Sequence, residues 1–268
     1  MEIRWHTPRD PRALPEDAAL LPQDFATTGR HFAHVTGTPV TRFQVMGERS
    51  SGTNFAKRVL GRNTELKPTE ALGWKHGFPQ MTAVPADTVI VCCVRNAADW
   101  ARSMHAKPWH TTPALQRMAF PDFIRAEWDT IVDRDRYFEE AGRLGLTGQP
   151  LQHDRDPLTG RRFADIFALR RAKLAALLSY AERDCNIAIL RMEELTADPA
   201  GTVDAFIAAF GLSAREGEFR GIARRLGSKF KAAVDNRPET PNALSGSDLD
   251  FLRSRVDAEQ EAELGYTY

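Results

Sequence analysis

The chain has 268 residues, of which 42% are hydrophobic, enough to bury the core of one large α/β domain. Its 36 basic residues balance 36 acidic ones, which excludes a global field that attracts nucleic acid and requires any anion site to be local. No apolar run has the length of a membrane span, the first residues carry no signal-peptide core, and the three cysteines are an odd number. We therefore expect one cytoplasmic domain over 1–268, with no integral membrane segment and no nucleic-acid partner.

The first predicted elements surround a glycine-bounded loop. Residues 1–35 are rich in proline and weakly periodic, so we expect an arm that packs on the domain surface. A strand is expected over 41–46 and a helix over 55–60, with Gly-Glu-Arg-Ser-Ser-Gly-Thr-Asn at 47–54 between them. Unpaired amides of this loop and of the first helical turn bind an anion without a metal. The alternative is an ordinary strand-to-helix turn capped by serine and threonine.

The loop lacks both groups that hold a magnesium triphosphate. In an NTP-hydrolysing P-loop, a lysine follows the second glycine, and a serine or threonine comes next. Here Thr53 replaces the lysine and Asn54 replaces the hydroxyl that binds Mg²⁺. The loop therefore predicts a phosphate that is not part of a metal-bound triphosphate, and a 5′-phosphosulfate is such a ligand.

The next elements are expected to continue a parallel sheet. A short strand is predicted near 72–75, and a continuous apolar, β-branched run at 88–94 is typical of a strand that is buried on both faces. That run ends in Arg95, and the helix that follows carries Ser103.

A long excursion over 107–160 follows, without strong periodicity, and we interpret it as a lid that binds an acceptor. The apolar positions over 163–181 keep helical spacing.

The last predicted strand, 186–190, leads to a clear helix start. Asp198 is the expected N-cap, and the helix is expected to run from Pro199 to about Phe210, with Gly211 closing it. Together these elements predict an α/β fold: a three-layer, P-loop-like domain with a central, mostly parallel sheet flanked by helices.

In motif order and spacing, these segments resemble the sulfotransferase family that uses 3′-phosphoadenosine 5′-phosphosulfate (PAPS). In that family a loop ending in Ser-Gly-Thr holds the 5′-phosphosulfate, and here that triplet is 51–53. An arginine after a later strand and a serine eight residues on hold the 3′-phosphate, which is the spacing of Arg95 and Ser103. The resemblance implies cofactor binding by Arg49, Ser50, Ser51, Gly52, Thr53, Asn54, Phe55, Arg95, Ser103 and Lys229.

The same resemblance implies the reaction. A sulfuryl group passes from PAPS to a hydroxyl or amine of a small-molecule, sugar or lipid acceptor, the product nucleotide is PAP, and no metal is required. The sequence specifies neither the acceptor nor an oligomeric state. Two alternatives remain open: a P-loop kinase-like phosphotransferase, and a non-catalytic nucleotide-binding module.

Sulfuryl transfer needs a base, and His76 is the first candidate because imidazole has a suitable pKa. Cytosolic sulfotransferases place a lysine and the catalytic histidine ahead of a proline with one residue between them, whereas Lys75 and His76 are adjacent. The alternative is a surface histidine at the start of a loop. His110 is a reserve base, and His105 and Trp109 are candidates for the acceptor side.

The reaction also needs a cation near the leaving oxygen. The family usually has a lysine before its Ser-Gly-Thr, but this chain has Ser50 there, so we expect Arg49 or Lys75 to supply the charge. The alternative for Arg49 is an ion pair with Glu48 or Glu194.

Weaker candidates have structural alternatives. Phe55 is either a stacking platform for adenine or a core residue, and Lys229 lies in a basic segment that is more often a solvated face. Phe120 and Trp128 are either ring-stacking acceptor contacts or core. Asp154, like Asp156, is interpreted as a turn residue without chemistry. No metal-binding motif is present.

Overall fold

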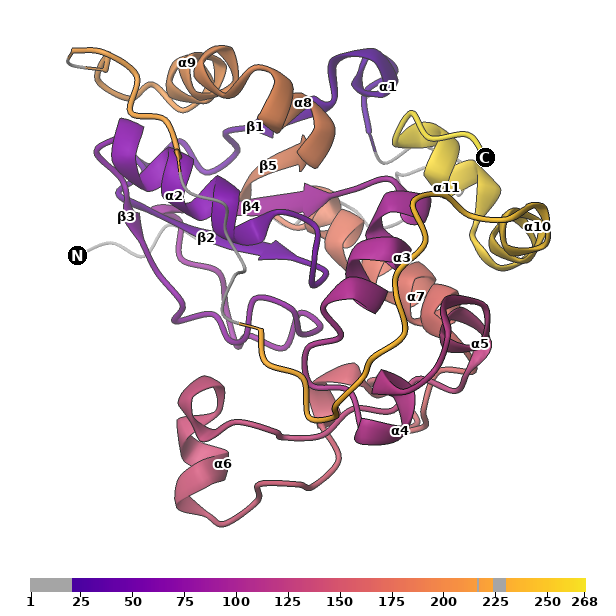
Figure 1. Ribbon diagram of the computed structural model, residues 1–268. Coiled ribbons are helices and arrows are strands. Elements are labelled where there is room, and N and C mark those ends of the chain that lie inside the picture. Colours follow the sequence, from indigo (N-terminus) through magenta and orange to yellow (C-terminus); the bar gives the residue numbers. More distant parts are fainter. Residues whose placement is uncertain (1–20, 216, 224–229) are drawn as a thin grey trace.

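The computed structural model describes residues 21–215, 217–223 and 230–268. Its five-stranded sheet has the order β1-β5-β4-β2-β3, with helices on both faces, and so the expected mostly parallel α/β architecture is present (Figure 1). The strands are β1 (Arg30–Ala33), β2 (Arg42–Gly47), β3 (Lys67–Pro68), β4 (Thr88–Val94) and β5 (Asn186–Arg191). The α-helices are α1 (Phe25–Thr28), α2 (Thr53–Asn63), α3 (Ala97–Ala106), α4 (Pro113–Gln116), α5 (Phe120–Arg125), α6 (Glu139–Arg143), α7 (Ile166–Leu178), α8 (Met192–Ala197), α9 (Pro199–Ala209), α10 (Gly246–Arg255) and α11 (Ala258–Glu263). The 3₁₀ turns are η1 (Asp135–Tyr137), η2 (Gln152–Asp154) and η3 (Ser179–Glu182).

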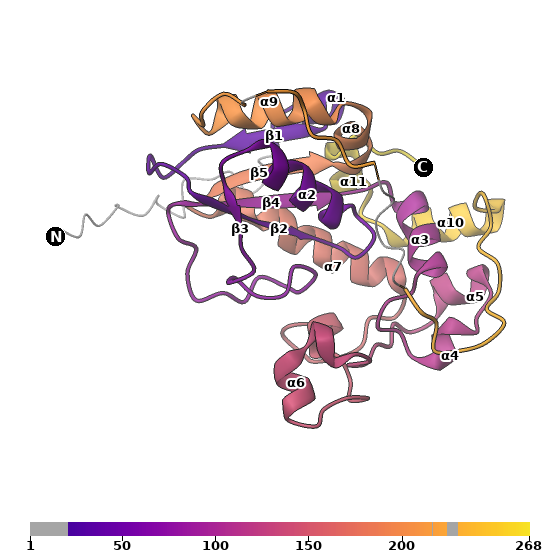
Figure 2. The same ribbon diagram turned by 60° about the vertical axis from the view of Figure 1, so that its left-hand side comes forward.

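Side-chain alternation along the central strands builds two cores. In β4, Val89 and Val91 pack with α2 and α9, while Ile90 and Cys92 face the opposite core with α7. Figure 2 shows α2 and α9 above the sheet and α7 below it. Because β4 is buried on both faces, its unbroken apolar sequence is explained.

A third apolar cluster lies beyond the carboxyl ends of the strands, where α3, α5, α7 and α10 meet. Phe120 and Trp128 are buried within it, at 2% and 1% exposure, so they are core residues and not acceptor contacts. His105 is also buried and bonds Thr240 and the Met118 carbonyl, which removes it from the acceptor side. The residues over 107–160 supply part of this cluster, and their role as a lid stays a prediction.

The predicted short strand at 72–75 is wrong. The strand that follows β2 and pairs with it is β3, and residues 71–77 form turns instead. The Gln44 side chain accepts from the Leu72 amide and donates to the Gly73 carbonyl, both at 2.9 Å, and Gly73 takes a positive φ of 97°. A side chain of β2 therefore takes the hydrogen bonds that a neighbouring strand would have made.

The expected surface arm is also wrong in part. Residues 30–33 form β1, which pairs antiparallel with β5 at the sheet edge, and the Phe32 ring lies 6.0 Å from that of Phe206. Residues 1–20 lie outside the described residues.

The start of α9 follows the prediction. The Asp198 side chain accepts from the Gly201 amide at 2.9 Å, and Pro199 is the first helical residue. Gly211 has a φ of 62° just past the helix end, as a closing glycine requires. No helix in the described part of the chain combines the length and apolar character needed to cross a bilayer.

Phe206→Ala tests the packing of α9 on the sheet. Phe206 is fully buried between Phe32 and Phe210, so its truncation should lower the free energy of unfolding by about 3–5 kcal/mol. Urea denaturation measures this loss. Leu158→Ala, at a side chain that is 93% exposed, should change the same quantity by less than about 0.5 kcal/mol. Equal effects at the two positions would contradict this account of the core.

Candidate functional site

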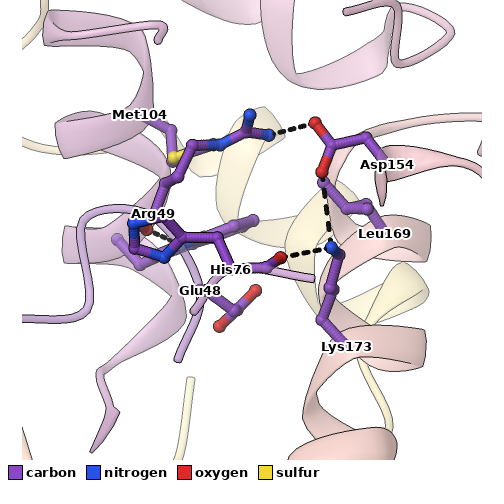
Figure 3. A pocket seen from close by; sticks show the side chains of 8 residues that line it. Glu48, Arg49, His76, Met104, Asp154, Leu169 and Lys173 are labelled. Carbon is purple, nitrogen blue, oxygen red and sulfur yellow. Dashed lines mark hydrogen bonds and ion pairs between the residues drawn. The ribbon is translucent and has the colours of Figure 1, made fainter. Parts of the chain in front are cut away.

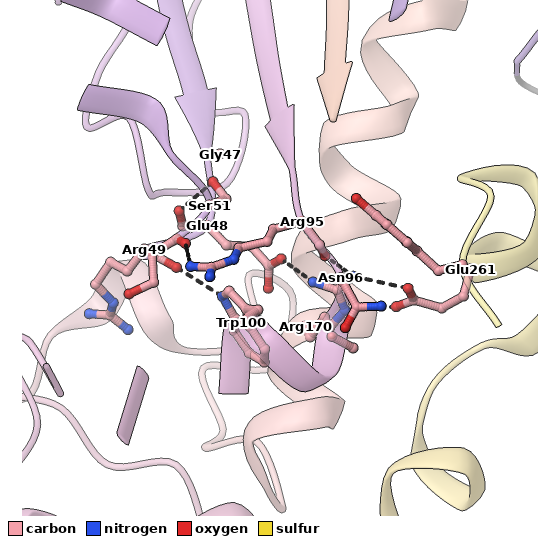
Figure 4. A network of polar contacts seen from close by, with 12 residues as sticks. Gly47, Glu48, Arg49, Ser51, Arg95, Asn96, Trp100, Arg170 and Glu261 are labelled. Atoms are coloured by element: carbon pink, nitrogen blue, oxygen red, sulfur yellow. Dashed lines mark hydrogen bonds and ion pairs between the residues drawn. The ribbon is translucent and has the colours of Figure 1, made fainter. Parts of the chain in front are cut away.

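The candidate site lies where two neighbouring parallel strands end. β2 pairs with β3 on one side and β4 on the other, and Gly47 is in register with Cys93. The glycine loop leaves β2 at Gly47, and Arg95 leaves β4 one residue after its end (Figure 4). Ligands of open α/β sheets bind outside the carboxyl ends of strands where the order reverses, and this is such a point.

The loop leaves its helix start uncapped. Ser50 and Gly52 take positive φ values of 64° and 90°, and the Ser51 hydroxyl donates to the Glu48 carbonyl at 2.7 Å. The N-cap of α2 is Gly52, which has no side chain to cap it. Among residues 21–215, 217–223 and 230–268, no group accepts from the amides of Gly52, Thr53 and Asn54. The alternative of a turn capped by serine and threonine therefore loses its support, and these amides are free to bind an anion.

Arg95 and Ser103 are brought together as their spacing predicted. The Arg95 Nη1 donates to the Ser103 Oγ at 2.8 Å and to the Ser50 carbonyl at 3.0 Å. The Asn96 side chain caps α3 by accepting from the amides of Ala98 and Asp99, which fixes the turn between β4 and this helix. The guanidinium of Arg95, seen beside the glycine loop in Figure 4, thus joins this loop to α3.

His76 and Lys75 are both fixed to the glycine loop. The His76 Nδ1 lies 2.7 Å from the Gly47 carbonyl, and the Lys75 Nζ donates to the Asn54 Oδ1 at 2.6 Å. Because a carbonyl only accepts, Nδ1 carries the proton and Nε2 keeps its lone pair. Burial, with Lys75 alongside, lowers the pKa of His76 well below its usual value, so the ring is neutral at neutral pH.

Arg49 pairs with a residue that the sequence did not suggest. Its Nη2 lies 2.5 Å from the Asp154 Oδ2, while the Arg49 carbonyl accepts from the Trp100 indole at 2.8 Å. Neither Glu48 nor Glu194 is its partner, since these pair with other arginines. The predicted ion pair is therefore assigned to the wrong carboxylates.

Asp154 ends the 3₁₀ turn η2, so it is a turn residue as expected, but its carboxylate is buried and ion-paired, which the sequence did not indicate. It accepts from Arg49, and the Lys173 Nζ lies 3.3 Å from its Oδ1 (Figure 3). Burial alone would raise the pKa of Asp154, but Arg49 and Lys173 hold it well below its usual range. Burial lowers the pKa of Lys173 to about 8, against the attraction of Asp154. Asp156 is a turn residue, as expected, and bonds the amides of Leu158 and Thr159.

A small cavity of about 10 Å³ lies under the Arg49 side chain, room for about one water molecule. The Arg49 Nη1 is buried beside it and has no hydrogen-bond partner in the described part of the chain. The lining residues are Glu48, Arg49, His76, Trp100, Met104, Asp154, Leu169 and Lys173 (Figure 3).

Beneath the loop, Arg170 of α7 binds two carboxylates. Its side chain is fully buried, and it donates to Glu48 at 2.8 Å, to Glu261 at 2.7 and 3.0 Å, and to the Arg95 carbonyl at 2.8 Å (Figure 4). Burial raises the pKa of Glu48 to about 7, although Arg170 opposes this. The Arg170 guanidinium therefore holds the glycine loop, the end of β4 and α11 together.

The sequence does contain a signal for the two cations of α7. Arg170 follows Ile166 and precedes Leu174 at helical spacing, and Lys173 lies likewise four residues after Leu169. Both charges therefore occupy the apolar stripe that faces the core, where a charge needs a buried partner. Asp154 has no comparable local signal.

The remaining predicted residues are divided between site and core. Ser51 and Thr53 are buried within the loop turn. Phe55 is half-buried and packs against the core of α2 and α9, and its role as a platform for adenine stays a prediction. His110 bonds Asp133 at 2.6 Å, and its ring lies 5.8 Å from that of Trp74. Lys229 lies outside the described residues.

Arg170→Met should lower the free energy of unfolding by about 3–5 kcal/mol at pH 8, because Glu48 and Glu261 then lose their buried partner. A raised folded-state pKa favours folding at low pH, and that contribution is lost as the pH rises through about 7 for Glu48. At pH 5.5 the Glu48 carboxyl is protonated and no longer needs a buried cation, so Arg170→Met should lower the free energy of unfolding by less than at pH 8. Urea denaturation of both proteins at the two pH values measures it, and a deficit that grows in acid would contradict the assignment.

No protein-family model, no curated protein and no solved structure matches this chain. Within the described residues, no three His, Cys, Asp or Glu side chains are grouped as a metal site requires. The motif resemblance to sulfotransferases is left without independent support from these comparisons, and the function is inferred from the geometry of the site.

Proposed function

We propose that this protein transfers a sulfuryl group from PAPS to a hydroxyl or amine of an acceptor and releases PAP. The observation that carries the proposal is the guanidinium of Arg95, bonded to both Ser103 and the Ser50 carbonyl of the glycine loop. The Arg95 guanidinium and the Ser103 hydroxyl form one candidate anion site. The free amides of the glycine loop form a second candidate anion site beside it. PAPS has two anionic groups, one on each side of its nucleoside, and two adjacent sites match such a ligand.

The 5′-phosphosulfate would bind at the loop and the first turn of α2. The free amides of Gly52, Thr53 and Asn54 supply donors and the helix dipole supplies positive potential there. Asn54 accepts from Lys75 through its side chain, which sets an ammonium beside the same turn. The Thr53 side chain is buried, and the Asn54 side chain is bonded to Lys75. Thr53 and Asn54 therefore do not replace the lysine and the Mg²⁺-binding hydroxyl of a triphosphate site.

The proton of the acceptor would pass to the Nε2 of His76. Nδ1 is held by the Gly47 carbonyl, so the ring presents its basic nitrogen in a fixed tautomer. As that proton leaves, the acceptor oxygen or nitrogen bonds to sulfur, the bond from sulfur to the bridging oxygen breaks, and the electron pair remains on the phosphate of PAP.

Lys75 is the better candidate for the cation at the leaving oxygen. Arg49 is already paired with Asp154, whereas no described carboxylate lies within ion-pair distance of the Lys75 Nζ. Burial lowers the pKa of Lys75, with the positive charge of Lys57 acting in the same direction against Glu70. The Arg49 Nη1 is buried and has no hydrogen-bond partner among the described residues, so it would stabilise an oxygen that enters the small cavity.

PAP binding tests the nucleotide site directly. In calorimetry without Mg²⁺, the protein should bind PAP, and Arg95→Ala should weaken binding by about 100-fold because a charged donor to the 3′-phosphate is lost. Arg253→Ala, at a half-exposed arginine of α10, is the matched control and should bind normally. Binding of ATP with Mg²⁺ in place of PAP would favour the kinase-like alternative. Tight PAP binding without turnover on a broad acceptor panel would favour the non-catalytic module.

His76→Gln tests the base. It should lower kcat by about 10²–10⁴-fold and leave PAP affinity unchanged. Because the pKa of His76 is lowered, the rate of the wild type should stay level as the pH falls from 8 through 6.5, where an ordinary histidine titrates, and should fall only at lower pH as the ring takes up a proton. Initial rates with PAPS between pH 5 and 8 measure both effects. A wild-type rate for His76→Gln would move the role to another group, with His110 next.

A further inference from the structure

A second and much larger cavity, of about 580 Å³, lies beside the candidate site. It is formed by the turns between β3 and β4, with one residue from the excursion over 107–160. Its volume is within the range of small-molecule sites, about 300–1,000 Å³. The lining residues are Ala71, Leu72, Gly73, Trp74, Gly77, Phe78, Gln80, Met81, Thr82, Ala83 and His153.

Among the described residues that line the cavity, none has a formally charged side chain at neutral pH. Leu72, Trp74, Phe78 and Met81 supply aliphatic, aromatic and thioether surface, while Gln80, Thr82, His153 and backbone groups make the exposed lining somewhat more polar than apolar. Burial and the neighbouring Lys173 lower the pKa of His153, which keeps this ring neutral. An anionic ligand would therefore lose its hydration in this cavity without gaining a charged partner from the lining.

Trp74 connects the cavity to the groups proposed for the chemistry. The indole lines the cavity, yet its ring centre lies 5.2 Å from that of His76 and 5.8 Å from the Cζ of Arg49. Gly77 follows His76 directly, and His153 precedes Asp154, which holds Arg49. The linings of the two cavities share no residue, but Trp74 and these sequence neighbours place the larger cavity next to the groups around Arg49.

We propose that this cavity binds the acceptor, and that the acceptor is an uncharged alcohol or phenol that combines an apolar ring or chain with hydrogen-bonding groups. This inference rests on the proposed sulfuryl transfer. The ring or chain of the acceptor would pack on Trp74, Phe78 and Met81, with its hydroxyl directed past the indole to the Nε2 of His76. The hydroxyl proton goes to that nitrogen, its oxygen bonds to sulfur, and PAP leaves with the electron pair of the broken S–O bond. Charged sugars are disfavoured because the lining offers them no ion pair.

Thr82→Lys tests the cavity by adding one cation at an exposed lining position. The probes are 2-naphthol and its anionic analogue 6-hydroxy-2-naphthoate, titrated by calorimetry into the full chain with and without PAP. The wild type should bind 2-naphthol at one site and bind the carboxylate at least 10-fold more weakly. Thr82→Lys should reverse this preference, and Thr82→Trp, which fills the space without charge, should weaken both probes at least 10-fold. Leu158→Lys, at an exposed position outside the lining, should bind as the wild type does.

The outcomes separate this inference from the proposed reaction. Absence of 2-naphthol binding, or binding that neither Thr82 variant changes, would overturn the acceptor site even if PAP binds. Binding of 2-naphthol that follows the expected pattern, in a protein that does not bind PAP, would support the uncharged cavity and overturn the sulfotransferase. With both ligands bound, sulfation of 2-naphthol from PAPS should show the same order among the variants.

Discussion

The fully buried guanidinium of Arg170 is the interaction on which the rest of the site depends. It binds Glu48 from the glycine loop, Glu261 from α11 and the Arg95 carbonyl at the end of β4, so three segments distant in sequence meet at one cation. The carboxylates of Glu48 and Glu261 share the single positive charge of Arg170. Burial of these three groups is tolerated because the guanidinium donates hydrogen bonds to both carboxylates and to the Arg95 carbonyl. The loop cannot change its shape without breaking this arrangement.

The rest of the site is organised by hydrogen bonds to backbone and side-chain groups of the glycine loop. His76 and Lys75 are held by Gly47 and Asn54, and the Gly47 amide donates to the Lys75 carbonyl at 3.0 Å. The turn that carries the proposed base is therefore attached to the loop that would carry the nucleotide. Such preorganisation lowers the cost of aligning the reacting groups. Burial also keeps the His76 ring neutral. The buried guanidinium of Arg49 is compensated by its ion pair with Asp154.

The sequence predicts the central strands well because continuous apolar runs at 88–94 and 186–190 have few other uses in a domain of this size. It also predicts the contact of Arg95 with Ser103, which depends on helical spacing. It fails where a partner is distant in sequence. β1 is a four-residue edge strand whose partner is β5, and Gln44 replaces a strand at 72–73. The partner of Arg49, Asp154, lies across the fold in a segment without periodicity, whereas the charges of α7 could be recognised from the stripe they occupy.

The antiparallel edge strand has a consequence for the order of assembly. Arg30 of β1 pairs with Leu190 of β5, so the partner of β1 is translated only after most of the domain has left the ribosome. β5 lies between β1 and β4, which makes it the last strand needed to join the edge to the centre. Contacts of such sequence separation form slowly because a long loop must close first. During synthesis the β1 segment therefore has no partner strand until β5 has been made, and pairing of β1 with β5 is a late step in folding.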